Sequence, residues 1–298
     1  MNKRTTAIAY VEIVIVNIIW GLSFIASKAA LESGFQPFTL AAVRFLMSTT
    51  LLLPVVLLRE GMPRFTRREW VQMLLGGVSG ISLYFLFEYK GLLYTTAGNA
   101  SLILAAIPVI AMLVGVIRQH IRYSAKIYAG VLGSLAGVYL VVRYGAADGA
   151  PNALLGNLFL LGACLCWVAY IELTTDMTMK HSSLSLTFYQ GLLGMLTLIP
   201  LCFSEQVQFA QIAPVGWLAA AFLGILCSAI AYIMYADAMR SLDPLRTSMF
   251  INLNPVAAVL GGVLLLNETV TPMQMIGGAL IMLSILYVNW ALAKGKAA

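Results

Sequence analysis

Long apolar segments separated by short polar breaks run through the whole sequence. Each segment is about as long as the roughly 20 residues that a helix needs to cross a bilayer. Most of the breaks contain only a few residues, so neighbouring helices are expected to be antiparallel. The pattern predicts ten membrane-spanning helices, over residues 10–30, 37–58, 70–93, 96–117, 124–143, 154–175, 184–204, 214–237, 246–266 and 271–292.

The second half of the chain repeats the first at an offset of 147 residues, as when Trp20 matches Trp167. A period of half the length indicates a duplicated structural unit, and the two units are predicted to be residues 1–147 and 148–298. Because each unit holds five spans, an odd number, the second must enter the membrane from the opposite side. The predicted fold is an all-α membrane protein, with two inverted-topology five-helix repeats around a central cavity. This arrangement is typical of secondary transporters, whose substrate site lies near the midplane.

Composition agrees with a lipid environment. Of the 298 residues, 61% are hydrophobic and 10% charged, against roughly 45–50% and 25% in soluble domains. Most of the 18 Lys and Arg fall in breaks on one side of the membrane, and basic residues favour cytoplasmic loops. Both termini are therefore predicted to be cytoplasmic, in a multi-pass protein of the inner (plasma) membrane. The net charge of +6 then requires no nucleic-acid partner.

Aromatic side chains mark the helix faces that are expected to line the cavity. In the first helix, Trp20 and Phe24 share one face with Lys28. The matching stripe of the sixth helix holds Trp167, with Tyr170 alongside. Both tryptophans lie well inside their spans, away from the interfacial belt, and a buried indole needs an acceptor for its N–H. They are interpreted as cavity-lining residues, with ordinary helix packing as the alternative.

An acidic residue lies deep in the third helix. Glu88 follows Tyr84 by four residues, on the same face, and is roughly 9 Å from the outer end of the span. A carboxylate at such a depth costs about 2.5–3.5 kcal/mol, so it should face a cavity or a partner. Lys28 is a better placed partner than Lys90. Binding of substrate or of a proton is the leading interpretation, and a structural ion pair or snorkelling to the surface are the alternatives.

Further substrate-binding candidates come from positions at matched depth. Tyr232 and Tyr235 correspond in the second repeat to Phe85 and Glu88. Asn99 lies near the start of the fourth helix and Asn252 near the start of the ninth. Glu12, in the first turn of its helix, is a second proton-coupling candidate, with a snorkelling, solvated carboxylate as the alternative.

Two prolines at equivalent positions, Pro108 and Pro255, are expected to shape the cavity. A proline frees a backbone carbonyl that another group must satisfy, although a kink for helix packing alone is the alternative. Asn254 precedes Pro255 directly. Arg44, inside the second span, should face protein or water rather than lipid. Glu268 is expected to be a solvated or capping group at the end of the ninth helix.

Several short motifs occur together in one order and spacing. They are Trp20-Gly21-Leu22-Ser23-Phe24, Tyr94-Thr95-Thr96-Ala97-Gly98-Asn99-Ala100, Asn252-Leu253-Asn254-Pro255-Val256 and Gly277-Gly278-Ala279. Together they resemble the ten-helix, EamA-type permeases of the drug/metabolite transporter superfamily, over essentially the whole chain. The resemblance implies a cavity lined by helices 1, 3, 4, 6, 8 and 9, with helices 5 and 10 at the periphery.

The chain departs from this family in two places. It has Ile117-Arg118-Gln119-His120 where many relatives end the fourth helix with Leu-Gly-Glu, and it carries Glu88 and Lys90 where many have apolar or aromatic residues. We expect the second departure to determine specificity. The resemblance implies transport of small polar or amphipathic metabolites. Amino acids or their derivatives are the first expectation, and organic cations such as choline-like compounds or drugs, or nucleosides, are the alternative.

The expected partners are the lipid bilayer, a small-molecule substrate and a coupling proton, for a monomer or weak homodimer that moves its cargo by alternating access. An enzyme is not expected, because both histidines lie in predicted loops and no HExxH pair or glycine-rich GK[ST] loop occurs. The four cysteines have no metal or redox spacing, so no cofactor or metal is expected either. A channel would need a continuous polar face or rings of charge, and the aromatic candidates argue against one.

Overall fold

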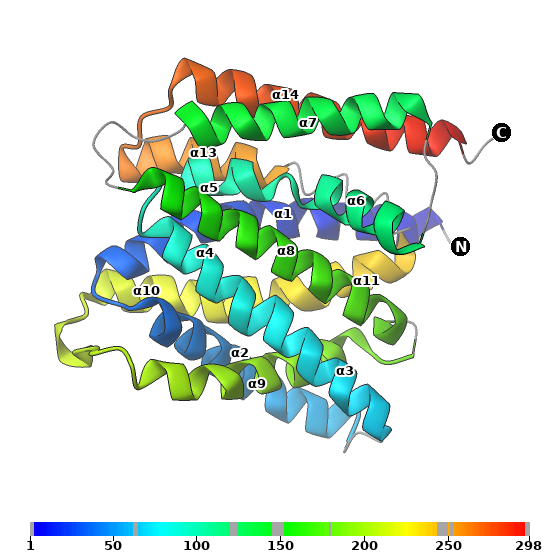
Figure 1. The fold of residues 1–298 in the computed structure, drawn as a ribbon. Helices are drawn as coiled ribbons and strands as arrows, with labels where there is room; N and C mark the ends of the chain where they lie inside the picture. Colours follow the sequence, from blue (N-terminus) through cyan, green and yellow to red (C-terminus); the bar gives the residue numbers. More distant parts are fainter. Residues whose placement is uncertain are drawn as a thin grey trace.

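A computed structural model describes residues 3–61, 65–119, 124–144, 152–178, 180–242, 250 and 253–295. These residues form helices and short connecting turns (Figure 1). In the first repeat the elements are α1 (Lys3–Glu32), α2 (Pro37–Arg59), α3 (Arg67–Gly77), η1 (Val78–Leu83), α4 (Tyr84–Leu92), α5 (Ala97–Leu104), α6 (Ile107–Gln119) and α7 (Ala125–Tyr144). In the second they are α8 (Ala153–Thr178), α9 (Ser183–Cys202), η2 (Phe209–Gln211), α10 (Pro214–Ala221), η3 (Phe222–Ile230), α11 (Ala231–Ser241), α13 (Leu253–Leu266) and α14 (Pro272–Gly295).

The ten predicted spans are confirmed as helical segments. The third consists of α3, η1 and α4 in succession, the fourth of α5 and α6, and the eighth of α10, η3 and α11. Among the described residues, seven segments are long and apolar enough to cross a membrane. Shorter apolar stretches lie in the other three spans, over Ala125–Val141 of α7, Leu253–Leu266 of α13 and Pro272–Val288 of α14. The part of the ninth predicted span before Leu253, apart from Phe250, lies outside the described residues.

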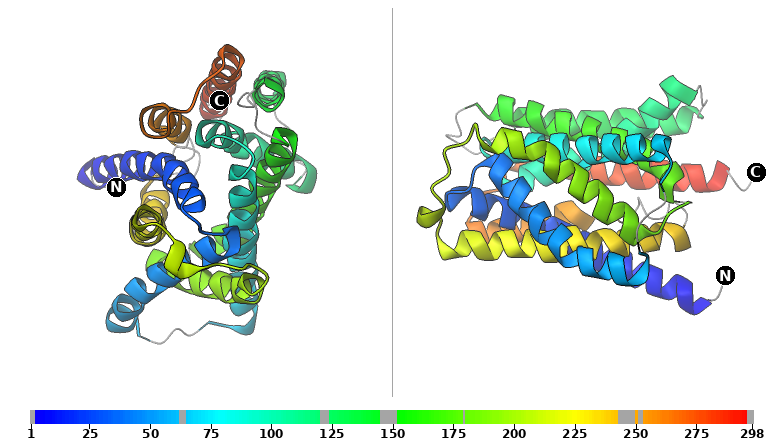
Figure 2. Two further views of the ribbon diagram at one scale, coloured as in Figure 1. Left: turned by 90° about the vertical axis from the view of Figure 1, so that its left-hand side faces the viewer. Right: turned by 90° about the horizontal axis from the view of Figure 1, so that it is seen from below.

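The inverted repeat is visible in the packing of equivalent helices. Figure 1 places both chain ends at one end of the bundle, with α7 and α14 side by side along one edge. Figure 2, seen end-on, keeps this pair outside the other helices, as the peripheral fifth and tenth helices were expected to be. A Cβ built on Gly137 would lie 2.7 Å from the Gly277 carbonyl oxygen, and one on Gly277 would lie 2.8 Å from that of Gly137. Such small residues let backbones approach closely in membranes.

Both repeats carry a π-helical segment at the same place. The segment η1 ends at Leu83 and η3 ends at Ile230, positions that are 147 residues apart. Such wide turns shift the register of the following helix and occur frequently at functional sites. Here they lead directly into α4 and α11, which begin with Tyr84 and with Ala231-Tyr232.

The fourth span is broken where its proline predicts a break. α5 ends at Leu104 and α6 begins at Ile107, with Ala105 and Ala106 in the turn between them. Pro108 has no N–H to donate to the carbonyl of Leu104, so the regular helix cannot continue through this point.

Acidic residues near helix ends satisfy the first N–H groups of other helices. Glu205 accepts hydrogen bonds from the backbone N–H groups of Phe38 (2.9 Å) and Thr39 (2.8 Å), at the start of α2. Glu268 accepts them from Ala97 (2.7 Å) and Gly98 (3.1 Å), at the start of α5. Glu268 is therefore a capping group, as the sequence suggested, but for a helix of the opposite repeat.

Candidate functional site

A central cavity lies where the two repeats face each other. About 610 Å³ of space in and around it is not occupied by atoms, counted together with the space that is open to solvent. Helices α1, α4, α5, α6, α8, α11 and α13 contribute to its lining, which matches the spans that the resemblance implies, and α2 is added through Arg44. The lining residues are Trp20, Ser23, Phe24, Arg44, Tyr84, Phe85, Glu88, Ser101, Leu104, Ala105, Ile107, Trp167, Tyr232, Asn254 and Pro255.

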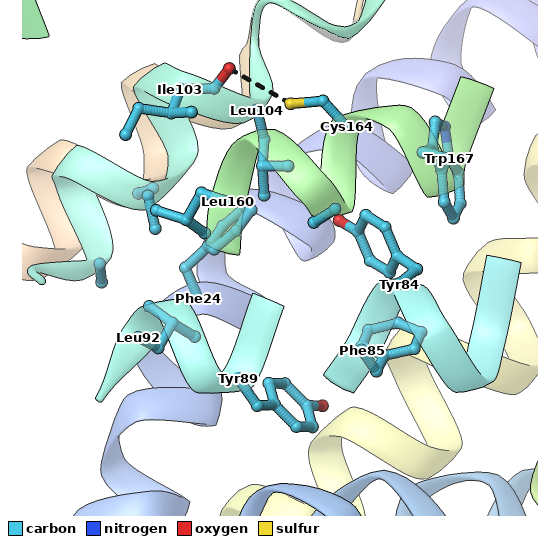
Figure 3. Packing of buried hydrophobic residues seen from close by; sticks show 14 of the residues in the cluster. Phe24, Tyr84, Phe85, Tyr89, Leu92, Ile103, Leu104, Leu160, Cys164 and Trp167 are labelled. Carbon is cyan, nitrogen blue, oxygen red and sulfur yellow. Dashed lines mark hydrogen bonds between the residues drawn. The ribbon is translucent and has the colours of Figure 1, made fainter. Parts of the chain in front are cut away.

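Aromatic rings form one wall of the cavity. The equivalent residues Trp20 and Trp167 meet edge to face, with ring centroids 6.2 Å apart. Tyr84 lies 4.9 Å from Trp167, and Tyr232 lies 5.5 Å from Trp20. Figure 3 shows Tyr84, Phe85 and Trp167 close together, on α4 and α8. The wall therefore unites side chains from both repeats.

The indole of Trp20 has the partner that its depth demands. Its N–H donates a 3.1 Å hydrogen bond to the backbone carbonyl of Cys227, which lies in the π-helical segment η3. In return, the thiol of Cys227 contacts the carbonyl of Ile19 at 3.9 Å. The wide turn thus holds a cavity-lining ring in place by its backbone.

Glu88 lies at the cavity with 2% of its surface exposed. Within the described part of the chain, its Oε1 atom has no hydrogen-bond partner. The expectation that Lys28 would pair with Glu88 is wrong. The Lys28 ammonium lies 3.4 Å from Oε1 of Glu268 and donates to the carbonyl of Thr95 at 3.0 Å. Lys28 therefore belongs to the capped end of the bundle rather than to the cavity.

Arg44 supplies the cavity's positive charge, and it too is 2% exposed. Its Nε donates to the Ser228 hydroxyl at 2.5 Å, and Nη1 donates to the Tyr89 hydroxyl at 3.0 Å. The guanidinium carbon lies 4.2 Å from the centroid of the Phe85 ring, within range of a cation–π contact. Neutral groups therefore hold this cation in a fixed orientation.

Of the ten predicted substrate-binding residues, the structure brings six to the cavity lining: Trp20, Phe24, Tyr84, Glu88, Trp167 and Tyr232. Tyr170 and Tyr235 pack behind the wall, with ring centroids 5.0 Å from Trp167 and 4.9 Å from Trp20, respectively.

Asn99 is fully buried away from the cavity lining, and its amide donates to Thr95 and Asn157 at 2.7 and 2.8 Å. The structure thus gives Asn99 a role in joining α5 to α8. Asn252 lies outside the described residues. Glu12 is partly exposed in the N-terminal part of α1 and is absent from the lining.

Several lining residues were not among the predicted candidates. A signal existed for Arg44, a charge inside a span, and for Asn254, an amide beside a proline. Ser23, Ser101, Leu104, Ala105 and Ile107 gave none, because small and aliphatic residues look the same on every face of an apolar helix. They reach the cavity through the break between α5 and α6 and through the face of α1.

The comparison with known families decides what this architecture is. The model of the EamA-like transporter family matches residues 7–143 and again residues 154–290. The chain belongs to the EamA-like transporter family. This EamA protein is accordingly a multi-pass membrane transporter of the drug/metabolite transporter superfamily and not an enzyme.

Individual relatives cover nearly the whole EamA chain. An "uncharacterized transporter" of Archaeoglobus fulgidus is 30% identical over 93% of this chain and 94% of its own length. The "uncharacterized transporter YyaM" of Bacillus subtilis is 26% identical over 93% of this chain and 92% of its own length. A "probable terminal-alkyne amino-acid exporter" of Streptantibioticus cattleyicolor is 23% identical over 93% of this chain and 92% of its own length. A solved crystal structure shares the fold, with a TM-score of 0.68 at 22% identity, over 97% of this chain and 99% of that one.

Proposed function

We propose that this EamA transporter is a secondary transporter that moves amino acids or their derivatives across the inner (plasma) membrane by alternating access. The observation that carries the proposal is a buried, unpartnered carboxylate oxygen, that of Glu88, in an aromatic cavity between inverted repeats. A distant relative is named as an amino-acid exporter, and this supports the choice among metabolites.

The cavity offers two kinds of contact to such a cargo. The carboxylate of Glu88 binds an ammonium group, and the ring of Tyr84, four residues before it on the same helix, adds cation–π attraction. The indoles of Trp20 and Trp167 contact an apolar side chain. Glu88 also carries the coupling proton when the ammonium is absent, because the same carboxylate can be neutralised by either ligand.

The inverted repeats supply the movement. Equivalent rings, such as those of Trp20 and Trp167, meet at the centre, so rocking of one repeat against the other opens the cavity to either side in turn. The bias of basic residues toward one side of the membrane supports an orientation with both termini in the cytoplasm. Because one chain contains the whole cavity lining named above, a monomer or a weak homodimer is sufficient.

A ligand screen on the purified protein tests the cargo. A ligand that binds only the folded state at 100 times its Kd stabilises that state by about 2.7 kcal/mol, which raises the unfolding temperature by roughly 5–10 °C. We expect such a shift with at least one of the twenty amino acids. A shift with choline or a nucleoside, and none with any amino acid, would favour the alternative cargo class.

Transport by Glu88→Gln tests the site. In proteoliposomes, the substitution is expected to abolish uptake of the amino acid found in the screen, whereas Glu32→Gln, at an exposed position at the end of α1, should transport like the wild type. Unchanged uptake and unchanged pH dependence in Glu88→Gln would refute the role of the carboxylate.

A further inference from the structure

Arg44 was expected to face protein or water, but it was not among the predicted substrate-binding residues, because the family resemblance does not include the second span in the cavity lining. In the structure, the backbone of α2 at Arg44 packs against a glycine of η3, and this close packing lets Arg44 reach the cavity. A Cβ built on Gly224 would lie 2.8 Å from the Arg44 carbonyl oxygen and 2.8 Å from Cβ of Met47. Only a residue without a side chain lets α2 pack this closely against η3.

The guanidinium of Arg44 keeps donors for a further partner. A guanidinium has five N–H donors, and the hydrogen bonds to Ser228 and Tyr89 occupy Nε and one N–H of Nη1. Neither partner is charged, so neither neutralises the cation. Arginine stays protonated in proteins, and a buried cation is costly without an opposite charge.

The nearby opposite charge, Glu88, faces the same cavity but does not close on Arg44. Among the described residues, no ion pair within 4.0 Å joins the two side chains. Oε1 of Glu88 and the side-chain oxygen of Asn254, which also lines the cavity, both lack a hydrogen-bond partner in the described residues. The cavity therefore presents one cation with free donors and, separately, two free acceptors.

We propose that Arg44 binds the carboxylate of the cargo while Glu88, helped by Asn254, binds its ammonium group, so that the preferred cargo is a zwitterionic α-amino acid. This inference rests on the proposed function and narrows it. A zwitterion supplies both missing partners and adds no net charge to the buried site. An amine without the carboxylate adds a positive charge to the buried site, and a carboxylate without the ammonium adds a negative one.

The arrangement of Arg44 suits a carboxylate. Two parallel N–H bonds from a planar guanidinium match the two oxygens of a carboxylate. The hydrogen bonds to Ser228 and Tyr89 and the contact with the Phe85 ring fix the plane of the guanidinium beforehand, which lowers the entropic cost of binding.

The test compares matched ligands on the wild-type protein. The best amino acid of the twenty is measured by thermal shift beside its decarboxylated amine and its deaminated acid, for example L-leucine beside isoamylamine and 4-methylpentanoate. The amino acid is expected to bind at least 10-fold more tightly than either analogue. An amine that binds as tightly as its amino acid overturns the role of Arg44 and leaves the proposed transport of amino acids intact. Binding by no amino acid overturns the proposed function itself, and this inference with it.

A variant then assigns the carboxylate contact. Arg44→Gln is expected to lower the affinity for the amino acid by 10-fold or more. In this variant, the amine should bind at least as tightly as the amino acid. Loss of packing alone would weaken both ligands equally and would refute the assignment. Arg143→Gln, exposed at the end of α7, is the matched control and should keep the wild-type preference. If Arg44→Gln does not fold, the ligand comparison on the wild type still decides.

Discussion

Replacing Glu268 by alanine removes a side chain that joins three parts of the bundle. Its carboxylate accepts N–H bonds from Ala97 and Gly98 at 2.7 and 3.1 Å, and it lies 3.4 Å from the Lys28 ammonium. The side chain is only 7% exposed. The substitution therefore leaves the first N–H groups of α5 and a half-buried lysine without their partner.

The expected cost follows from these contacts. Loss of a helix cap costs about 0.5–2 kcal/mol, and a charged hydrogen bond in a buried site contributes about 1.5–3 kcal/mol. Because the contacts share one carboxylate, their contributions are not additive, and a total of roughly 2–3 kcal/mol is expected. At about 2–4 °C for each kcal/mol, the unfolding temperature should fall by roughly 4–12 °C.

Thermal unfolding of the detergent-solubilised protein, followed by tryptophan fluorescence, measures this. Glu268→Gln keeps an oxygen acceptor for one N–H, so its unfolding temperature should fall by about half as much as that of Glu268→Ala. Glu32→Ala, an exposed acid at the same end of the bundle, is the control and should shift the midpoint by less than about 1 °C. A Glu268→Ala midpoint within 1 °C of the wild type would refute the capping role.

Three further predictions follow from other contacts. Gly194→Ala should lower stability by about 1–3 kcal/mol, because its Cβ would lie 2.7 Å from the Gly77 carbonyl oxygen. Gly191→Ala, whose Cβ would have its nearest contact at 3.4 Å, should be tolerated. Equal unfolding midpoints for the two variants would contradict this prediction. Trp20→Phe should cost roughly 1 kcal/mol, because the Cys227 carbonyl loses its 3.1 Å donor, and an unchanged midpoint would exclude that contribution. In a variant free of its four cysteines, a cysteine introduced at Ser33 should react with an impermeant thiol reagent from outside the cell. A cysteine introduced at Arg59 should react only after permeabilisation. The reverse pattern would contradict the proposed orientation.

The architecture could be predicted from the sequence because a lipid bilayer permits few backbone structures. Apolar length predicts the spans, and the offset that relates Trp20 to Trp167 predicts that these residues are equivalent. Their meeting at the centre follows from the inversion of the repeats. The acceptor that the Trp20 indole requires could be expected, but not its identity, because the Cys227 carbonyl is offered by a π-helical turn that no local pattern marks.

The candidate site was less accessible to prediction. The position of Arg44 depends on how closely α2 approaches Gly224, a property of two helices that are distant in the sequence. The pairing of Lys28 with Glu268 rather than with Glu88 depends on which helix ends meet. Asn99 has the polarity of a binding residue, yet its amide serves contacts between helices, and polarity alone cannot distinguish these two uses.

Uptake of the amino acid found in the screen, measured in proteoliposomes against an unlabelled competitor, tests the central claim most directly. Alternating access through the cavity of Glu88 and Arg44 predicts slow, saturable uptake that an internal pool of the same amino acid accelerates by exchange. Glu88→Gln should abolish this uptake. Non-saturable flux with single-channel currents in a planar bilayer, or full uptake by Glu88→Gln, would contradict the account.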